Sequence, residues 1–194
     1  MLNLYSTYGN LKSVVRLSPL FILRLLNGHV SESRKALYDN CHLDNINALF
    51  YGPHKIIDNI YLGSAYHASN WELLDSLEIT HVINVAIEVP NYFEDDLYYL
   101  QTDKIKDNDE EIFKKEELDK LIEKIEEILK NPKNKIFVHC LVGRSRSVTI
   151  LIAYLLKYKK ITLDKSIELL KNKREYINPS IKLINFLKDN YVEK

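Results

Sequence analysis

Cys140 and Arg146, with five residues between them, are the side chains of this sequence whose types and spacing could do chemistry together. A β-branched and aromatic run, Ile136–Val138, ends in His139-Cys140, and Arg146-Ser147 opens a long apolar run. The pattern predicts a strand, a loop and a helix. Unpaired backbone N–H groups gather in such a loop at the positive end of the helix dipole, so the loop could bind a phosphate-like dianion.

Cys140 would lie at the floor of this loop, where its environment decides its reactivity. The loop N–H groups and Arg146 favour a thiolate over a thiol, which makes cysteine a nucleophile at neutral pH. The alternative is a structural cysteine on a buried strand, the usual role of a lone cysteine. The strand–loop–helix context favours the nucleophile, because a motif carries weight when its required structural setting is also predicted.

Residues 139–147, with the pattern HCxxGxxRS, resemble the signature of cysteine-based protein tyrosine phosphatases. The ending Ser145-Arg146-Ser147 is similar to that of the dual-specificity branch of this family. Upstream, Leu62-Gly63-Ser64 followed by the run 79–84, Ile-Thr-His-Val-Ile-Asn, also resembles the start of a dual-specificity phosphatase domain. The resemblance covers about residues 54–191.

The resemblance implies hydrolysis of a phosphoester through a phosphocysteine intermediate, without a metal or another cofactor. Cys140 would attack phosphorus, Arg146 would hold two phosphate oxygens, and Ser147 would donate a hydrogen bond to the departing thiolate. His139 would order the loop and support a lowered cysteine pKa, or it would be an ordinary histidine at a strand end. The phosphate would lie against a loop made of Leu141, Val142, Gly143, Arg144, Ser145 and Arg146.

Cleavage of a phosphoester also needs a proton for the departing oxygen, which a carboxylic acid near the loop would supply. Asp103, Asp107 and Asp109 lie in a polar stretch after the strand predicted at 97–101. In the family the acid follows that strand and often precedes an asparagine, so Asp107 matches best and Asp109 is the runner-up. The alternative is that all three are solvated loop charges or acids at a helix N-terminus.

Strands alternate with helices along the rest of the chain. Residues 55–63 form two short predicted strands around a turn, and His81 lies in a β-branched run without other histidines or cysteines at metal-ligand spacing, so no metal site is predicted. Further strands are predicted at 79–86 and 97–101, and helices at 64–77, at 113–130, at 146–156, from 161 and from 178. This order predicts an α/β fold, a three-layer sandwich with a central, mostly parallel sheet of about five strands and flanking helices.

Composition limits the classes of partner. The chain has 194 residues, and its 46% hydrophobic content is enough for the core of one catalytic domain. Its 27 basic and 27 acidic residues cancel, which disfavours nucleic acid as a partner. Cys41 and Cys140, without a secretory pattern, indicate a reducing compartment such as the cytoplasm, and no apolar run reaches the ~18 residues of a transmembrane helix.

Residues 1–53 are expected to form an N-terminal helical extension of a catalytic domain at 54–194, with Gly52-Pro53 between the two. The segment Leu11–Leu26 is apolar with interspersed basic residues. The favoured interpretation is a docking or homodimerisation helix, interrupted near Pro19. A transit peptide in residues 1–30, with import into an organelle, and a helix lying on a membrane surface are the alternatives.

Three functions are compatible with the site. The first is a phosphatase of phosphotyrosine and of phosphoserine or phosphothreonine in proteins, which the Ser145-Arg146-Ser147 ending favours. The second is a phosphatase of the same fold that acts on a phosphoinositide or an RNA 5′ phosphate. Lipid-directed relatives tend to carry lysines in the loop, whereas only Arg144 adds charge here. The third is a phosphate-binding interaction module, against which the presence of both Cys140 and Arg146 argues.

Overall fold

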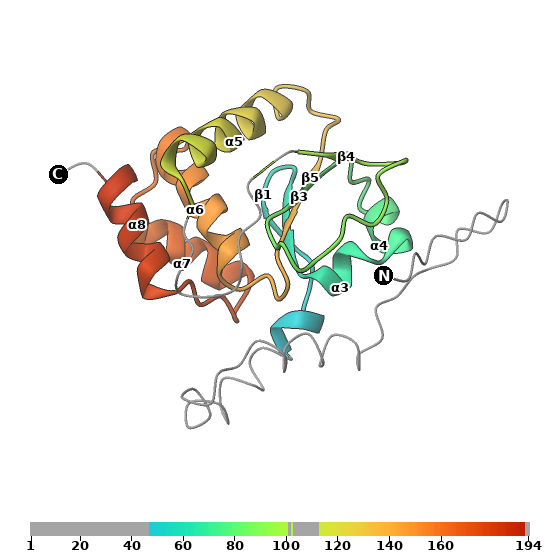
Figure 1. The fold of residues 1–194 in the computed structure, drawn as a ribbon, viewed down its shortest axis with the longest axis horizontal. Helices are drawn as coiled ribbons and strands as arrows, with labels where there is room; N and C mark the ends of the chain where they lie inside the picture. The colour runs from blue at the N-terminus through green and yellow to red at the C-terminus, as the bar shows by residue number, and fades with distance from the viewer. Residues whose placement is uncertain (1–46, 101, 103–112, 193–194) are drawn as a thin grey trace, which may run out of the picture.

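The computed structural model describes residues 47–100, 102 and 113–192 (Figure 1). A helical turn at 47–50 precedes the first strand. The remaining elements follow in the order β1 (His54–Ile57), β2 (Ile60–Gly63), α3 (Ala65–Ala68), α4 (Trp71–Ser76), β3 (His81–Asn84), β4 (Tyr98–Tyr99), α5 (Lys115–Ile128), β5 (Ile136–His139), α6 (Arg146–Tyr158), α7 (Leu163–Lys173) and α8 (Ile181–Tyr191).

The described strands form one sheet of five, in the order β1-β2-β5-β3-β4. β1 pairs with β2 in antiparallel fashion, while β5 pairs in parallel with both β2 and β3, and β3 pairs in parallel with β4. The register places Gly63 and Asn84 on either side of His139. The strands β2, β5 and β3 therefore end at the same edge of the sheet, and Cys140 directly follows β5, the middle one of the three.

Helices cover both faces of the sheet, and the predicted three-layer architecture is confirmed (Figure 1). On one side α5, α6, α7 and α8 pack over the larger core, to which Ile136 and Val138 of β5 contribute. On the other side α3 and α4 pack over a smaller cluster that includes Phe137. All four residues of β5 are buried, as expected for a central parallel strand covered on both faces.

Polar side chains shorten two of the predicted elements. The helix predicted at 64–77 is divided into α3 and α4, because the Asn70 side chain accepts a hydrogen bond from the Leu73 N–H and begins a new helix. The strand predicted at 79–86 ends at Asn84, whose side chain donates to the Val89 carbonyl at 2.8 Å and accepts from the Ala86 N–H at 3.1 Å. Asn84 therefore turns the chain directly after β3.

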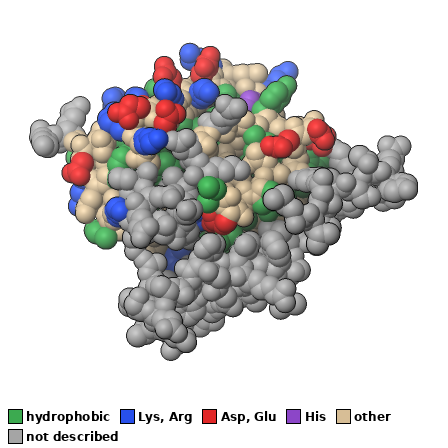
Figure 2. Space-filling model, in the orientation of Figure 1, with side chains coloured by type: hydrophobic (Ala, Val, Ile, Leu, Met, Phe, Trp, Pro, Cys, Tyr) green, Lys and Arg blue, Asp and Glu red, His purple; other side chains and the backbone are tan. Residues whose placement is uncertain are grey.

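His81 has the local partner expected of a strand histidine, since its Nδ1 lies 2.7 Å from the Thr80 hydroxyl. Among the described residues, no group of three or more histidines, cysteines or carboxylates could hold a metal ion. No helix in the same part of the chain has the length and apolarity needed to cross a membrane. Basic and acidic side chains are interspersed on the described part of the face shown in Figure 2, without a field of one sign.

Candidate active site

The loop that follows β5 has the predicted setting between a strand end and a helix start. Cys140 is 2% exposed and is not part of a disulfide, and α6 begins at Arg146. Gly143 has a φ of 73°, a left-handed conformation that L side chains rarely adopt. The Leu141 carbonyl accepts from the Ala65 N–H at 3.0 Å, which joins the loop to the residues after β2. The loop is thus fixed by neighbouring strand ends.

The Cys140 sulfur accepts hydrogen bonds from inside its own loop. The Gly143 N–H lies 3.2 Å from Sγ, and the Ser147 hydroxyl lies 3.4 Å from Sγ. Hydrogen bonds to the charged form of a group favour that form, so both donors favour the thiolate. The N-terminus of α6 adds its positive dipole at the same place.

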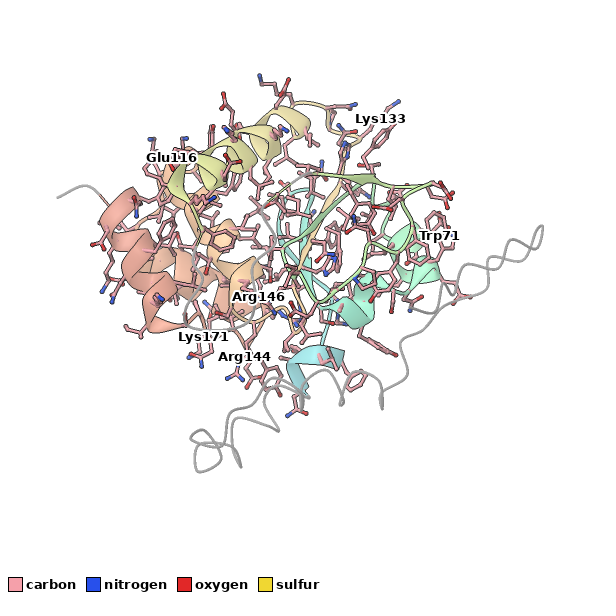
Figure 3. All side chains as sticks on the ribbon, in the orientation of Figure 1. Trp71, Glu116, Lys133, Arg144, Arg146 and Lys171 are labelled. Atoms are coloured by element: carbon pink, nitrogen blue, oxygen red, sulfur yellow. The ribbon has the colours of Figure 1, made fainter. Side chains whose placement is uncertain are left out.

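Arg146 is held by a carboxylate that the sequence analysis did not single out. Its two terminal nitrogens donate to Glu88, at 3.0 Å to Oε2 and at 2.6 Å to Oε1. Both side chains are shielded from solvent, with 3% of the Arg146 side chain and 10% of the Glu88 side chain exposed. In Figure 3 Arg146 lies in the interior of the molecule near the start of α6, whereas half-buried Arg144 lies closer to the edge of the view.

His139 contacts the backbone of the cysteine. The ring is fully buried, with Nδ1 3.2 Å from the Cys140 carbonyl oxygen, and it stacks on Phe137 at a centroid separation of 5.6 Å. These contacts hold the backbone at the point where strand becomes loop.

Arg174, at the end of α7, binds the opposite side of the loop and was also missed from the sequence. Its Nε donates to the Gly143 carbonyl at 2.8 Å, and a terminal nitrogen donates to the Val142 carbonyl at 3.0 Å. The side chain is 0% exposed. Burial lowers the pKa of Arg174 to about 10, and the charge of Cys140 acts in the opposite direction, so the guanidinium stays charged at neutral pH.

The segment after Arg174 binds the rest of the loop. The Arg144 carbonyl accepts from the Asn178 N–H at 2.8 Å, and the Ser145 hydroxyl accepts from the Ser180 N–H at 3.1 Å. No local sequence pattern indicates these contacts, because the connection between α7 and α8 reaches the loop only in the folded chain.

The structure thus brings Cys140, Arg146, Ser147 and His139 together around the predicted loop. Leu141, Val142 and Gly143 are buried, and Arg144 and Ser145 are partly exposed. Asp107, the predicted acid, lies outside the described residues, as do Asp103 and Asp109. The described residues offer a loop that could bind an anion, a buried sulfur that could act as a nucleophile, and a buried arginine at the start of α6.

The family model that describes the dual specificity phosphatase catalytic domain matches residues 60–192. Human dual specificity protein phosphatase 1 is 39% identical over 139 residues, and human dual specificity protein phosphatase 4 is 37% identical over 138 residues. Each match covers 70% of this chain but only 36% and 34% of the respective relative, so the chain spans about a third of the length of these proteins.

Among solved structures, the human tyrosine phosphatase-like serine/threonine/tyrosine-interacting protein superimposes with a TM-score of 0.63 at 26% identity, over 70% of this chain and 93% of that one. The crystal structure of DUSP15 also gives a TM-score of 0.63, at 27% identity, over 70% of this chain and 84% of that one. These likenesses confirm the fold, and the family model covers well over half of the chain. The chain therefore belongs to the dual specificity phosphatase catalytic-domain family.

Proposed function

We propose that the chain hydrolyses phosphotyrosine and phosphoserine or phosphothreonine in proteins through a phosphocysteine intermediate. The observation that carries this proposal is the Cys140 sulfur, buried at the floor of the loop and hydrogen-bonded by Gly143 N–H and Ser147 hydroxyl. The names of the curated relatives, which are dual specificity protein phosphatases, support the choice of a protein substrate.

In the first step, the Cys140 thiolate attacks phosphorus in line with the leaving oxygen, so that an S–P bond forms as the P–O bond breaks. The guanidinium of Arg146 exchanges the Glu88 carboxylate for two equatorial phosphate oxygens, which offer the same bidentate geometry. Loop N–H groups stabilise the charge that is spread over the phosphoryl oxygens.

Asp107 gives its proton to the leaving oxygen in this step. This role is assigned to Asp107 because its position resembles that of the acid in the family. In the second step Asp107 takes a proton from water, the water oxygen bonds to phosphorus, and the S–P bond breaks. The Ser147 hydroxyl, 3.4 Å from Sγ, donates to the thiolate that departs. His139 keeps the backbone of Cys140 in place and transfers no proton.

The 194-residue chain should hydrolyse a small aryl phosphate in the presence of a metal chelator, and vanadate should block the reaction. Cys140→Ser should reduce turnover to background, because a serine hydroxyl is far less ionised than a thiol at neutral pH. Vanadate or phosphate binding by the folded variant serves as the control that the loop is intact. Full turnover by Cys140→Ser would refute the proposed function.

The acid is tested by comparing leaving groups. Asp107→Asn should slow the cleavage of an alkyl phosphate, which needs protonation, by about 100-fold or more, while an aryl phosphate with an acidic phenol is slowed much less. Asp109→Asn is the matched control and should leave both rates near those of the original protein. The reverse pattern would assign the acid to Asp109.

We also propose that residues 1–53 extend the catalytic domain and that Leu11–Leu26, outside the described residues, supports homodimerisation. The described part of this extension, residues 47–53, contacts the catalytic domain, so its removal is a separate question from the removal of Leu11–Leu26. Light scattering should show a dimer for the 194-residue chain and a monomer for a chain that lacks residues 1–46. A monomer in both cases would refute the dimer.

A further inference from the structure

The guanidinium of Arg174 lies between two parts of the chain that are far apart in sequence. On one side it donates to the Val142 and Gly143 carbonyls of the phosphate loop. On the other side it donates to the Ala48 and Tyr51 carbonyls, at the end of the helical turn 47–50. A carbonyl at a helix end has no partner within the helix, so the guanidinium supplies one for each of these.

The bonds to the loop carbonyls determine where the loop N–H groups point. In a trans peptide group, the C=O of one residue and the N–H of the next point in opposite directions. Because Arg174 binds the Val142 carbonyl from behind, the Gly143 N–H points forward, and it donates to the Cys140 sulfur at 3.2 Å. By the same geometry, the bond to the Gly143 carbonyl turns the Arg144 N–H away from Arg174.

The helical turn 47–50 is itself fixed against the residues after β2. The Ser64 hydroxyl donates to the Leu49 carbonyl at 2.6 Å, and both Ala48 and Leu49 are at most 1% exposed. Phe50 packs edge-on against Tyr66 of α3, with the ring centroids 4.7 Å apart. Figure 1 shows this turn beside α3, at the end of the sheet where the phosphate loop lies.

We propose that Arg174 is a positioning residue of the phosphate loop and that residues 47–51 hold it in place, so that phosphatase activity depends on the packing of this N-terminal turn. The inference rests on the proposed function and adds a link between the extension and the reacting sulfur. Part of this effect acts through the loop backbone, since Arg174 binds the Val142 and Gly143 carbonyls and the Gly143 N–H binds the sulfur.

Arg174 also acts by its charge. The guanidinium favours the Cys140 thiolate, alongside Arg146, whose own charge is opposed by Glu88. His54 faces Arg174, with Nδ1 3.3 Å from a terminal nitrogen, and burial together with Arg174 lowers the pKa of His54, which keeps this ring neutral at neutral pH. Tyr51 is a further titratable group that acts on Arg174, and the charge of Arg174 in turn helps to lower the pKa of His67. His139 lies on the strand that leads to Cys140.

The first experiment measures the thiolate and the turnover separately in the full chain. A Cys41→Ser background leaves Cys140 as the single cysteine. The pH dependence of Cys140 alkylation by iodoacetamide reports its ionisation, and an aryl phosphate reports kcat/KM. Arg174→Met should move the alkylation midpoint to higher pH and lower kcat/KM about 100-fold, because the charge and the backbone bonds are both lost.

Arg174→Lys keeps the charge but cannot span acceptors on both sides. This variant should keep an alkylation midpoint close to that of the original protein while kcat/KM falls about tenfold. If both folded variants kept the original midpoint and the original kcat/KM, with a loss of thermal stability alone, Arg174 would be a structural residue and the inference would be overturned.

A second pair of variants tests the helical turn without touching Arg174. Leu49→Ala and Leu74→Ala remove the same side-chain atoms from equally buried sites, and Leu74 lies on α4 in the smaller core cluster. Leu49→Ala should lower kcat/KM about tenfold, whereas Leu74→Ala should stay within about twofold at a similar loss of stability. Equal losses would overturn the inference. If the chain hydrolysed no phosphate ester, the proposed function would be refuted. The link between Arg174 and Cys140 could still be tested, because alkylation of Cys140 needs no turnover.

Discussion

The two sides of the phosphate loop are each bound by a buried arginine, but the partners of the two arginines differ. On the front, Arg146 donates to the Glu88 carboxylate at the sheet edge. On the back, Arg174 donates to two backbone carbonyls of the loop. A carboxylate can be exchanged for a phosphate of the same bidentate geometry, whereas a backbone carbonyl stays where the chain places it. Under the proposed function the front exchanges partners, whereas the back stays fixed.

The two arginines also differ in what compensates their buried positive charge. A buried cation is costly unless it is paired and hydrogen-bonded. Glu88 neutralises Arg146 when no phosphate is bound, and a phosphate dianion would take over that role. Arg174 relies on carbonyl dipoles, and its positive charge favours the thiolate form of Cys140, the proposed nucleophile.

The same substitution at both arginines gives the largest expected contrast. Arg146→Lys should lower kcat/KM on an aryl phosphate by about 10²–10³-fold, because a lysine ammonium cannot present the planar fork that holds two oxygens of the transition state. Arg174→Lys, about tenfold impaired, is the matched control. Steady-state kinetics on both folded variants checks the ratio, and equal losses would remove the distinction between an exchanging side and a fixed side.

Glu88→Gln addresses the exchangeable partner. The amide keeps one acceptor for Arg146 but loses the charge and the second acceptor, so the guanidinium is held less firmly. We expect kcat/KM to fall about tenfold, in line with the loss of one charge-assisted hydrogen bond. Separate kcat and KM values on the aryl phosphate show whether Glu88 orients Arg146 or competes with phosphate. A lower KM with an unchanged kcat would show instead that Glu88 competes with phosphate and contributes nothing to orientation.

The difference between the two sides also explains what the sequence could predict. β5, the loop and α6 are contiguous, so strand propensity, a short loop and an apolar helical run were sufficient to place Cys140, Arg146 and Ser147. Glu88 and Arg174 reach the loop through the topology of the sheet and the path from α7 to α8. Neither has a local signal, because a lone glutamate or arginine in a turn is usually a solvated charge.

The same reasoning applies to the elements. The order of strands and helices followed from periodicity, but the break between α3 and α4 depends on the Asn70 cap, and the end of β3 depends on the Asn84 side chain. Caps of this kind compete with apolar periodicity, and the apolar pattern alone favoured one longer helix. The assignment of Asp107 stays a prediction, since that residue lies outside the described part of the chain.

The smallest expected effect is on stability and concerns His67, which lies on the fixed side. The ring is 1% exposed, and its Nδ1 accepts from the Ser64 N–H at 3.1 Å. Burial, with a further contribution from the charge of Arg174, lowers the pKa of His67 to about 3. An unfolded histidine has a pKa near 6.5, so the unfolded chain binds a proton that the folded chain excludes. Stability should therefore be lost as the pH falls below about 6.5.

At pH 5 this exclusion lowers the free energy of unfolding by about 2 kcal/mol. This pH lies about 1.5 units below the pKa of an unfolded histidine, and each unit corresponds to about 1.4 kcal/mol. His67→Asn keeps an acceptor for the Ser64 N–H but cannot be protonated. Urea unfolding of both proteins at pH 7 and at pH 5 should show a smaller loss in the variant, by about that amount. His54 and His81, whose pKa values are also lowered, are present in both proteins and cancel in the difference. Equal losses would mean that the folded protein accepts a proton at His67 beside Arg174, and the fixed side would then tolerate a new charge.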